Sequence, residues 1–324
     1  MRKYIDLHCD TLSRLFCEPA LGNLFENNCQ VDIKRLSVAG CCAQIFACFV
    51  EKTDFKKDSA WDDGYAYAGQ LLDLFDKEML ENKKAIGKVL SAADILSNES
   101  AGKLSAIVSV EEGGILNSDI KRLDDLYERG VRLLTLTWNF ENCIGYPNSS
   151  DAGMMTRGLK DFGFAVIERM NGLGMIVDVS HLSDGGFYDV AEYARKTGIP
   201  FAASHSCARV LTKHPRNLTD DMLKLIGDTG SVAGINFFHE FTTDTGFSDV
   251  ESIVRHAVYM IDKAGEDAVC IGSDFDGIDE SLEIGGAEKM PLLFDGLKKA
   301  RLTEAVIDKL CYGNAMRLFK TILR

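Results

Sequence analysis

The sequence has too little positive charge to attract a polyanion. It contains 36 lysine and arginine residues against 49 aspartate and glutamate residues, and its formal net charge at pH 7 is −13. A surface with this balance repels phosphate backbones and anionic lipid headgroups. We therefore expect neither nucleic acid nor a membrane among the partners of this protein.

The sequence also lacks a disulfide or metal framework built from cysteine. None of its ten cysteines forms a CxxC pair, and several lie in apolar runs such as residues 41–46, which is typical of reduced, buried thiols. No run of about 18 apolar residues occurs, and charged residues interrupt the first eight positions, where a signal peptide would be apolar. These absences predict a soluble, cytoplasmic protein and leave its oligomeric state open, a homodimer included.

Short apolar runs alternate with helical patterns along the whole chain. The predicted strands are 3–8, 42–49, 104–110, 131–137, 174–180, 199–204, 231–237 and 268–273. The predicted helices are 61–81, 91–99, 118–129, 158–172, 183–196, 219–228, 248–264 and 303–320, and Ser118, Ser183 and Thr219 are expected to cap three of them. The stretches 50–62 and 276–290 are expected to be surface loops.

This alternation favours one closed parallel barrel over an open sheet with a second domain. The chain has only five prolines, and no linker, internal repeat or low-complexity segment divides it. We therefore predict an α/β protein with a single TIM-like (β/α)8 barrel domain that covers residues 1–324.

Histidine is scarce, yet half of the six histidines stand at the ends of predicted strands. His8, His181 and His205 each stand where an apolar run ends. His8 and Asp10 are two residues apart, so in extended geometry both side chains point to one side. Each of these histidines by itself fits an ordinary structural role. His214, His239 and His256 end no predicted strand, and we expect them to be structural.

Carboxylates end two further strands. Glu111 and Glu112 follow the run that begins at Leu104, and Asp274 follows the last strand. In a parallel barrel the carboxyl ends of all strands open on one face, so these side chains and the three histidines would meet there. Imidazoles and carboxylates are ligands of zinc and similar divalent ions, and the set suffices for two ions that polarise a carbonyl group. Asp274 is our candidate for the proton transfer that such a reaction needs.

Five short motifs, in order, carry a resemblance to a known family. They are residues 6–10 (DLHCD), 112–114 (EGG), 178–181 (DVSH), 204–206 (SHS) and 272–277 (GSDFDG). The set resembles the membrane (renal) dipeptidase family of metallopeptidases, within the amidohydrolase superfamily, from about residue 4 to 320. The resemblance implies a distorted (β/α)8 barrel with two zinc ions per chain, which hydrolyses small dipeptides, including those with a D-residue at the C-terminal position.

The resemblance also implies roles for individual residues. One zinc ion would be bound by His8 and Asp10 and the other by His181 and His205, with Glu112 as the bridge. Asp274 would be the catalytic acid and base. Arg216, eleven residues after His205, would hold the terminal carboxylate of the substrate, as a guanidinium fork does well.

The sequence departs from the family pattern at two places. Trp138 stands where animal members have a histidine near the reacting carbonyl, so oxyanion stabilisation would fall to the metal alone or to another donor, with Asn139 as a candidate. Glu111 and Glu112 are adjacent where the family has one glutamate, and we choose Glu112 because it directly precedes Gly113.

Two other functions stay open at this point. The same barrel and metals could act on another small acyl substrate, such as a lactone or a cyclic amide, because fold and ligands do not fix specificity. The replacement at Trp138 also allows a metal-binding module without turnover.

Overall fold

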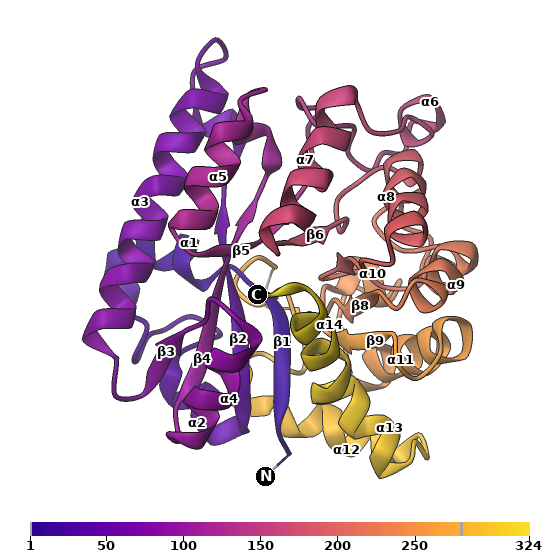
Figure 1. Cartoon of the computed structure of the whole chain (residues 1–324). Helices are drawn as coiled ribbons and strands as arrows, with labels where there is room; N and C mark the ends of the chain where they lie inside the picture. The colour runs from indigo at the N-terminus through magenta and orange to yellow at the C-terminus, as the bar shows by residue number, and fades with distance from the viewer. Residues whose placement is uncertain (1, 279–280) are drawn as a thin grey trace.

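The eight predicted apolar runs form parallel strands that close into a ring (Figure 1). The computed structural model describes residues 2–278 and 281–324. Around the ring the order is β1, β2, β4, β5, β6, β7, β8 and β9, and β9 pairs with β1. The ring strands are β1 Tyr4–Cys9, β2 Cys41–Phe49, β4 Leu104–Glu111, β5 Val131–Thr135, β6 Ile176–Asp178, β7 Ala202–Ala203, β8 Val232–Ile235 and β9 Val269–Ile271. The predicted TIM-like barrel is confirmed.

One strand escaped the sequence analysis. β3 (Ile86–Lys88) pairs with the first residues of β4, before β5 pairs with the last ones. It has only three residues, with a glycine in the middle, so it shows no apolar alternation that a pattern could reveal.

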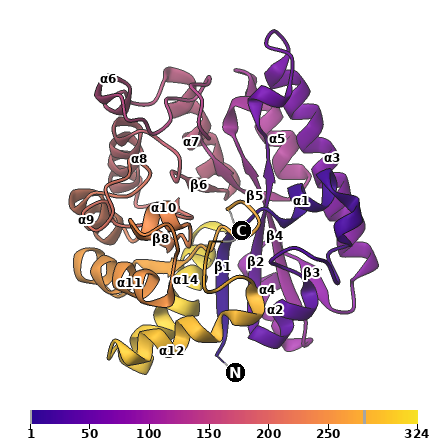
Figure 2. The ribbon, with the colours of Figure 1, turned by 180° about the vertical axis from the view of Figure 1, so that it is seen from behind.

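Helices surround the strands on the outside (Figures 1 and 2). Their bounds are α1 Thr11–Cys17, α2 Ile33–Ala39, α3 Ala60–Glu81, α4 Ala92–Ser100, α5 Ile120–Glu128, α6 Ala152–Met155, α7 Asp161–Leu173, α8 Asp184–Thr197, α9 Asp220–Asp228, α10 His239–Thr242, α11 Val250–Ala264, α12 Pro291–Lys299, α13 Glu304–Asp308 and α14 Asn314–Ile322. All eight predicted helices are present. The last is divided into α13 and α14 by a π-helical turn, and α1, α2, α6, α10 and α12 were not predicted.

Polar side chains fix where several of these helices begin. Ser183 Oγ accepts a hydrogen bond from the backbone N–H of Gly186, and Thr219 accepts one from Met222, as expected of N-caps. Ser118 is not a cap. Asp119 caps α5 instead, because its carboxylate accepts from Lys121 N–H at 3.0 Å.

Two apolar clusters stabilise the barrel. The inner cluster contains side chains from every ring strand, and side chains of α14, which crosses the centre of the view in Figure 1, join it. The outer cluster fills the space between strands and helices. Along β4, Ile107 belongs to the inner cluster whereas Val108 and Val110 belong to the outer one. Because successive strand residues point to opposite faces, Glu111 lies on the inner face.

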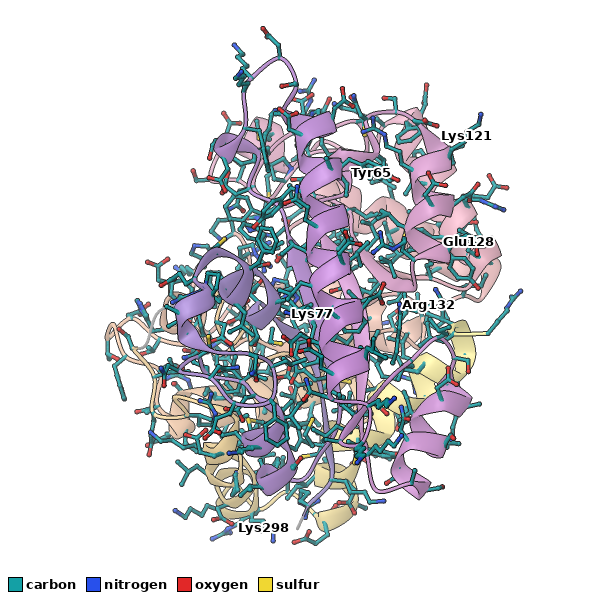
Figure 3. All side chains as sticks on the ribbon, turned by 90° about the vertical axis from the view of Figure 1, so that its left-hand side faces the viewer. Tyr65, Lys77, Lys121, Glu128, Arg132 and Lys298 are labelled. Atoms are coloured by element: carbon teal, nitrogen blue, oxygen red, sulfur yellow. The ribbon has the colours of Figure 1, made fainter. Side chains whose placement is uncertain are left out.

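Helix α3 shows how the outer layer is built. Leu71 and Phe75 on its inner side are buried in the outer cluster. Figure 3 shows α3 in front of the barrel, with Tyr65 and Lys77 on it and α5 beside it. The Arg122 guanidinium of α5 lies 4.7 Å from the ring centre of Tyr65 and joins the two helices.

The predicted loops are largely irregular. The stretch 50–62 contains only the short turn Lys52–Asp54 and the start of α3. The stretch 276–290 includes residues 279 and 280, which lie outside the described residues, and ends in the turn Ala287–Lys289. Within 2–278 and 281–324 no helix is both long and apolar enough to span a bilayer.

Candidate metal centre

The ends of five ring strands place a group of acidic and imidazole side chains at one mouth of the barrel. His8 is the next-to-last residue of β1, Glu111 ends β4, and His181, His205 and Asp274 lie two or three residues beyond β6, β7 and β9. All five are nearly inaccessible to solvent. The carboxyl ends of parallel strands gather at one face, so residues far apart in the sequence meet there.

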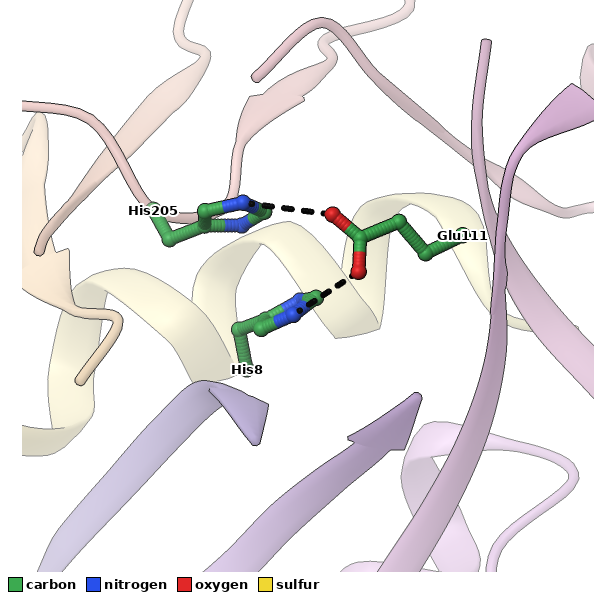
Figure 4. Close-up of side chains that lie close together, drawn as sticks. All are labelled: His8, Glu111 and His205. Atoms are coloured by element: carbon green, nitrogen blue, oxygen red, sulfur yellow. Dashed lines mark ion pairs between the residues drawn. The ribbon is translucent and has the colours of Figure 1, made fainter. Parts of the chain in front are cut away.

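The carboxylate of Glu111 lies between His8 and His205 (Figure 4), and it also contacts His181. Its Oε1 atom is 3.0 Å from Nε2 of His181 and 3.5 Å from Nε2 of His205, and its Oε2 atom is 3.3 Å from Nε2 of His8. The Nε2 atoms of His181 and His205 are themselves 3.0 Å apart. Three imidazole nitrogens therefore converge on one carboxylate.

The structure corrects our choice between the two adjacent glutamates. Glu112 faces away from the histidines because the strand alternation at Glu111 puts the next residue on the other side, and the Glu112 backbone turns there with a φ of 115°. Its carboxylate accepts hydrogen bonds from Trp138 N–H at 3.0 Å and from the Asn142 side chain at 2.6 Å. Glu112 therefore holds the segment after β5, while Glu111 occupies the position that we predicted for Glu112.

Asp10 and Asp274 extend the group on the other side of His8. Asp10 Oδ2 is 3.2 Å and Asp274 Oδ1 is 3.7 Å from Nε2 of His8. Two sets of three residues each have ligand atoms close enough to share an ion: His8, Glu111 and His205, and His8, Asp10 and Asp274. The other oxygen of Asp274 accepts a hydrogen bond from the Asn236 side chain at 2.7 Å.

Burial and crowding shift the pKa values of these groups. Burial and the charge of Arg216 lower the pKa of His181 to about 4. Burial and the charge of His8 lower the pKa of His205 well below its usual value. Both imidazoles are therefore neutral, as metal ligands must be. Burial, together with neighbouring carboxylates, raises the pKa of Asp10 to about 6 and that of Asp274 to about 7, against the effect of His8.

His8 and Glu111 form a charged pair inside this group. Burial alone would lower the pKa of His8, but the carboxylates of Glu111 and Asp10 raise it well above its usual value. Burial likewise favours neutral Glu111, but the charge of His8 and hydrogen bonds from His181 and His205 hold the pKa of Glu111 well below its usual value. A proton on His8 thus supplies positive charge where several acidic oxygens meet.

The group has the properties of a site for divalent cations. Imidazole nitrogen and carboxylate oxygen atoms are ligands that suit zinc and similar ions. Asp10 Oδ1 is buried and has no hydrogen-bond partner in the described part of the chain. A cation would satisfy this oxygen and relieve the repulsion among the carboxylates. The residues present therefore fit the metal that the sequence analysis expected.

A cavity of about 290 Å³ opens beside this group. Its lining includes the site residues Asp10, Glu111, His181 and Asp274, the predicted Arg216, Trp138 and Asn139, and the residues Phe49, Phe238, Phe241, Gly277 and Ile278. Its volume is at the lower end of the range for small-molecule pockets, about 300–1,000 Å³. The structure therefore brings together every predicted site residue except Glu112.

Arg216 is buried at one side of the cavity. Its guanidinium donates to the backbone carbonyl groups of Ser180 and His205 and lies 5.4 Å from the ring centre of Phe241. Its Nε atom is buried without a partner among the described residues. A buried guanidinium needs an acceptor for its remaining donors, and a carboxylate entering the cavity would supply one.

Trp138 and Asn139 lie on the segment that Glu112 holds. The Trp138 ring meets the Phe49 ring edge-on at 4.9 Å and lies 6.1 Å from the ring of His181. The Asn139 side-chain oxygen is 3.2 Å from Nδ1 of His181. Trp138 is thus part of an aromatic wall, and Asn139 orients a histidine of the candidate metal centre.

Some residues of the site were missed by the sequence analysis. Asn236 immediately follows β8, but the predicted strand 231–237 enclosed it, so the rule that identified His181 and His205 at strand ends did not select it. Phe238 and Phe241 line the cavity, but aromatic residues in a loop give no comparable signal.

The other histidines lie outside the group. The ring of His214 packs against Phe241 at 4.7 Å, and its Nδ1 accepts from Arg216 N–H. His256 is buried on α11, where Nδ1 accepts from Ala208 N–H at 3.1 Å and Nε2 is 3.2 Å from the carbonyl oxygen of Thr242.

His256 predicts a pH-dependent loss of stability. Burial and the charge of Arg255 lower the pKa of His256 to about 4, whereas an unfolded histidine titrates near about 6.5. The unfolded state therefore binds more protons between these values. The contribution of neutral His256, about 3 kcal/mol, is complete above pH 6.5 and is lost as the pH falls from 6.5 to 4. Urea unfolding at pH 7.5 and at pH 5 should show that the free energy of unfolding falls more for wild type than for His256→Gln. Equal losses in the two proteins would contradict this assignment.

Comparison with known proteins places the chain in a family. The sequence profile of the membrane dipeptidase family, peptidase family M19, matches residues 2–323. A Klebsiella pneumoniae protein known only as an uncharacterized protein in the pqqA 5′ region is 37% identical over 243 residues, which cover 72% of this chain and 88% of the relative. An uncharacterized dipeptidase of Schizosaccharomyces pombe is 30% identical over 308 residues, 91% of this chain and 73% of the relative.

Solved structures agree with this placement. The family M19 metallopeptidase dipeptidase AC superposes with a TM-score of 0.88 at 26% identity and covers 99% of both chains. A metallopeptidase from Rhodobacter sphaeroides, liganded with a phosphinate mimic of the dipeptide L-Ala-D-Ala, superposes with a TM-score of 0.86 at 26% identity, again over 99% of both chains. Since the family profile covers nearly the whole sequence and the relatives share the barrel, the chain belongs to the membrane dipeptidase family of metallopeptidases.

Proposed function

We propose that this protein is a dipeptidase that holds two zinc ions and hydrolyses the peptide bond of dipeptides, including those with a C-terminal D-residue. The observation that carries the proposal is the convergence of His8, His181 and His205 on the carboxylate of Glu111. The phosphinate dipeptide mimic in the Rhodobacter sphaeroides relative supports the choice of substrate.

The family resemblance suggests how the ligands would be divided between the two ions. His181 and His205 would hold one ion and His8 and Asp10 the other, and Glu111, which contacts all three histidines, would be the shared ligand in place of Glu112. When bound, the ions would activate water and polarise the peptide carbonyl. Glu111 is suited to bridging because its oxygens already face different histidines.

Asp274 would move the proton. Asn236 fixes one oxygen of its carboxylate, so the other is left to face the reacting groups. A pKa near about 7, raised by burial, lets this carboxyl group both accept and release a proton at neutral pH. Asp274 would take a proton from the attacking water and deliver it to the leaving amine.

Arg216 and the aromatic wall would bind and orient the dipeptide. The buried guanidinium would hold the terminal carboxylate, and Phe49 and Trp138 would close the cavity against water. With Trp138 in place of the family histidine, carbonyl polarisation would fall to the ions or to another donor, with Asn139, whose side chain lies beside His181, as the candidate.

Replacing Arg216 tests the substrate class. Arg216→Ala should lower kcat/KM for a free dipeptide by about 30- to 100-fold, mainly through KM, because a buried charge pair is worth about 2–3 kcal/mol. The corresponding dipeptide ester, which has no carboxylate, should lose less than about threefold by the same reasoning. Arg216→Lys keeps the positive charge but loses the planar fork of donors, so its kcat/KM for the free dipeptide should lie between the values of wild type and Arg216→Ala. An equal loss for both substrates would favour another small acyl substrate.

A further inference from the structure

A further carboxylate, that of Asp178, is completely buried beside the candidate metal centre. It ends β6 and accepts hydrogen bonds only from hydroxyl and backbone groups among the described residues. Oδ2 accepts from Thr135 Oγ1 and Ser204 Oγ, both at 2.7 Å, and Oδ1 accepts from Ser180 Oγ at 2.7 Å and Ser204 N–H at 2.8 Å. So many donors indicate that the acceptor is the ionised carboxylate.

Ser204 connects this carboxylate to a histidine of the candidate metal centre. Its Oγ atom is 2.7 Å from Asp178 Oδ2 and 2.8 Å from Nδ1 of His205. A hydroxyl group has a single proton, and the stronger, charge-assisted bond to Asp178 takes it. Ser204 can then only accept from His205, so Nδ1 of His205 must carry a proton.

The proton on Nδ1 determines that the other ring nitrogen of His205, Nε2, carries the free lone pair. A neutral imidazole protonated on Nδ1 has its lone pair on Nε2, and Nε2 of His205 is the atom that faces Glu111 Oε1 and His181 Nε2. We propose that Asp178 and Ser204 are positioning residues that hold His205 in the tautomer that binds metal. This inference rests on the proposed metal-dependent function.

The other two histidines are held differently. Nδ1 of His181 contacts the amide oxygen of Asn139, which lies in a loop. Nδ1 of His8 has no hydrogen-bond partner within residues 2–278 and 281–324. Within the described ranges, Nδ1 of His205 is the one Nδ1 atom of the three that is linked to a buried carboxylate, through a serine from its own strand end. The ion bound at His205 should therefore depend on this link more than on the loop that carries Asn139.

Ser204→Ala tests the link without removing any proposed ligand. The substitution leaves the Nδ1 proton of His205 buried without an acceptor, and loss of such a partner weakens metal binding by about 10- to 100-fold. Zinc affinity is measured by competition with a chelator, and the visible spectrum of the Co²⁺-loaded protein reports whether the ligand set changes. We expect weaker zinc binding and an altered Co²⁺ spectrum.

Thr135→Val provides the matched control. Thr135 donates to the same oxygen of Asp178 but lies on β5 and does not touch His205. The change is nearly isosteric, so it should lower stability while zinc affinity stays within about threefold, since no ligand loses its partner. Equal weakening in both variants would mean that Asp178 acts only as a general structural element, which overturns the proposal.

The outcomes separate this inference from the proposed function. Wild-type protein that binds no zinc refutes the proposed function itself. Wild-type protein that binds zinc, with Ser204→Ala binding it equally well, refutes only the positioning role. If circular dichroism shows that Ser204→Ala does not fold, Ser204→Cys takes its place, because a thiol is a weaker acceptor. That variant should bind zinc more weakly than wild type, and unchanged affinity overturns the proposal.

Discussion

Replacing Glu111 with Gln should remove bound metal and lower dipeptidase activity by more than about 100-fold, because even loss of a group behind a metal ligand costs about 10- to 100-fold. Glu111 is the only carboxylate within 3.5 Å of all three histidines in the described ranges. The neutral amide of glutamine cannot balance the positive charge of two cations. Its NH2 group would also place a hydrogen-bond donor, in place of an acceptor, beside one of the imidazoles. Elemental analysis of the purified protein, beside an assay with L,L- and L,D-dipeptides, measures both effects.

Glu112→Gln is the matched control, because the same change is made one residue away. Glu112 accepts from Gly114 N–H, Trp138 N–H and the Asn142 side chain. A glutamine can accept two of these bonds, but its amide nitrogen would face the third donor, at a cost of about 1–3 kcal/mol. We therefore expect lower stability with metal content retained. Metal loss in Glu112→Gln with normal metal in Glu111→Gln would restore our first choice of ligand.

Asp274→Asn should leave the metal in place and reduce kcat by about 10²- to 10⁴-fold, the usual contribution of general acid–base catalysis. The variant is nearly isosteric. Asparagine tolerates the left-handed φ of 64° at this position, and its amide oxygen can still accept from Asn236. Titrating zinc into the variant and measuring kcat at saturating dipeptide separates binding from proton transfer.

A different result would reassign this residue. Asp274 also belongs to the set of ligand atoms formed with His8 and Asp10. If Asp274→Asn loses metal together with activity, Asp274 is a ligand. Asn236→Ala then helps to interpret the result, because it frees the fixed oxygen of Asp274 without removing the carboxylate. It should cost less activity than Asp274→Asn in either case.

The barrel could be predicted from the sequence because its signal is local. The ring strands lie within short runs that are rich in apolar residues, and longer helices such as α3 and α11 show a regular apolar face. Several of the unpredicted elements have weak local signals. β3 has three residues, and α6 and α10 are single turns that depend on contacts made after folding.

The candidate site could be predicted only in part. His8 lies near the end of a strand, His181, His205 and Asp274 follow strands, and parallel strands end at one face, so their convergence follows from the topology. The choice between Glu111 and Glu112 could not be made in this way. Strand alternation predicts that the side chains of Glu111 and Glu112 point to opposite faces. The sequence does not show, however, where β4 ends or that the backbone turns at Glu112.

The sequence alone determined that imidazoles and carboxylates of this chain would meet at the open end of a parallel barrel, because period-2 patterns and strand ends are encoded within a few residues of each other. Only the tertiary structure decided which glutamate faces the histidines and which groups orient them. Those properties depend on side-chain direction and on partners such as Asp178 and Ser204, which come from neighbouring strands and are brought within hydrogen-bonding distance only when the ring closes.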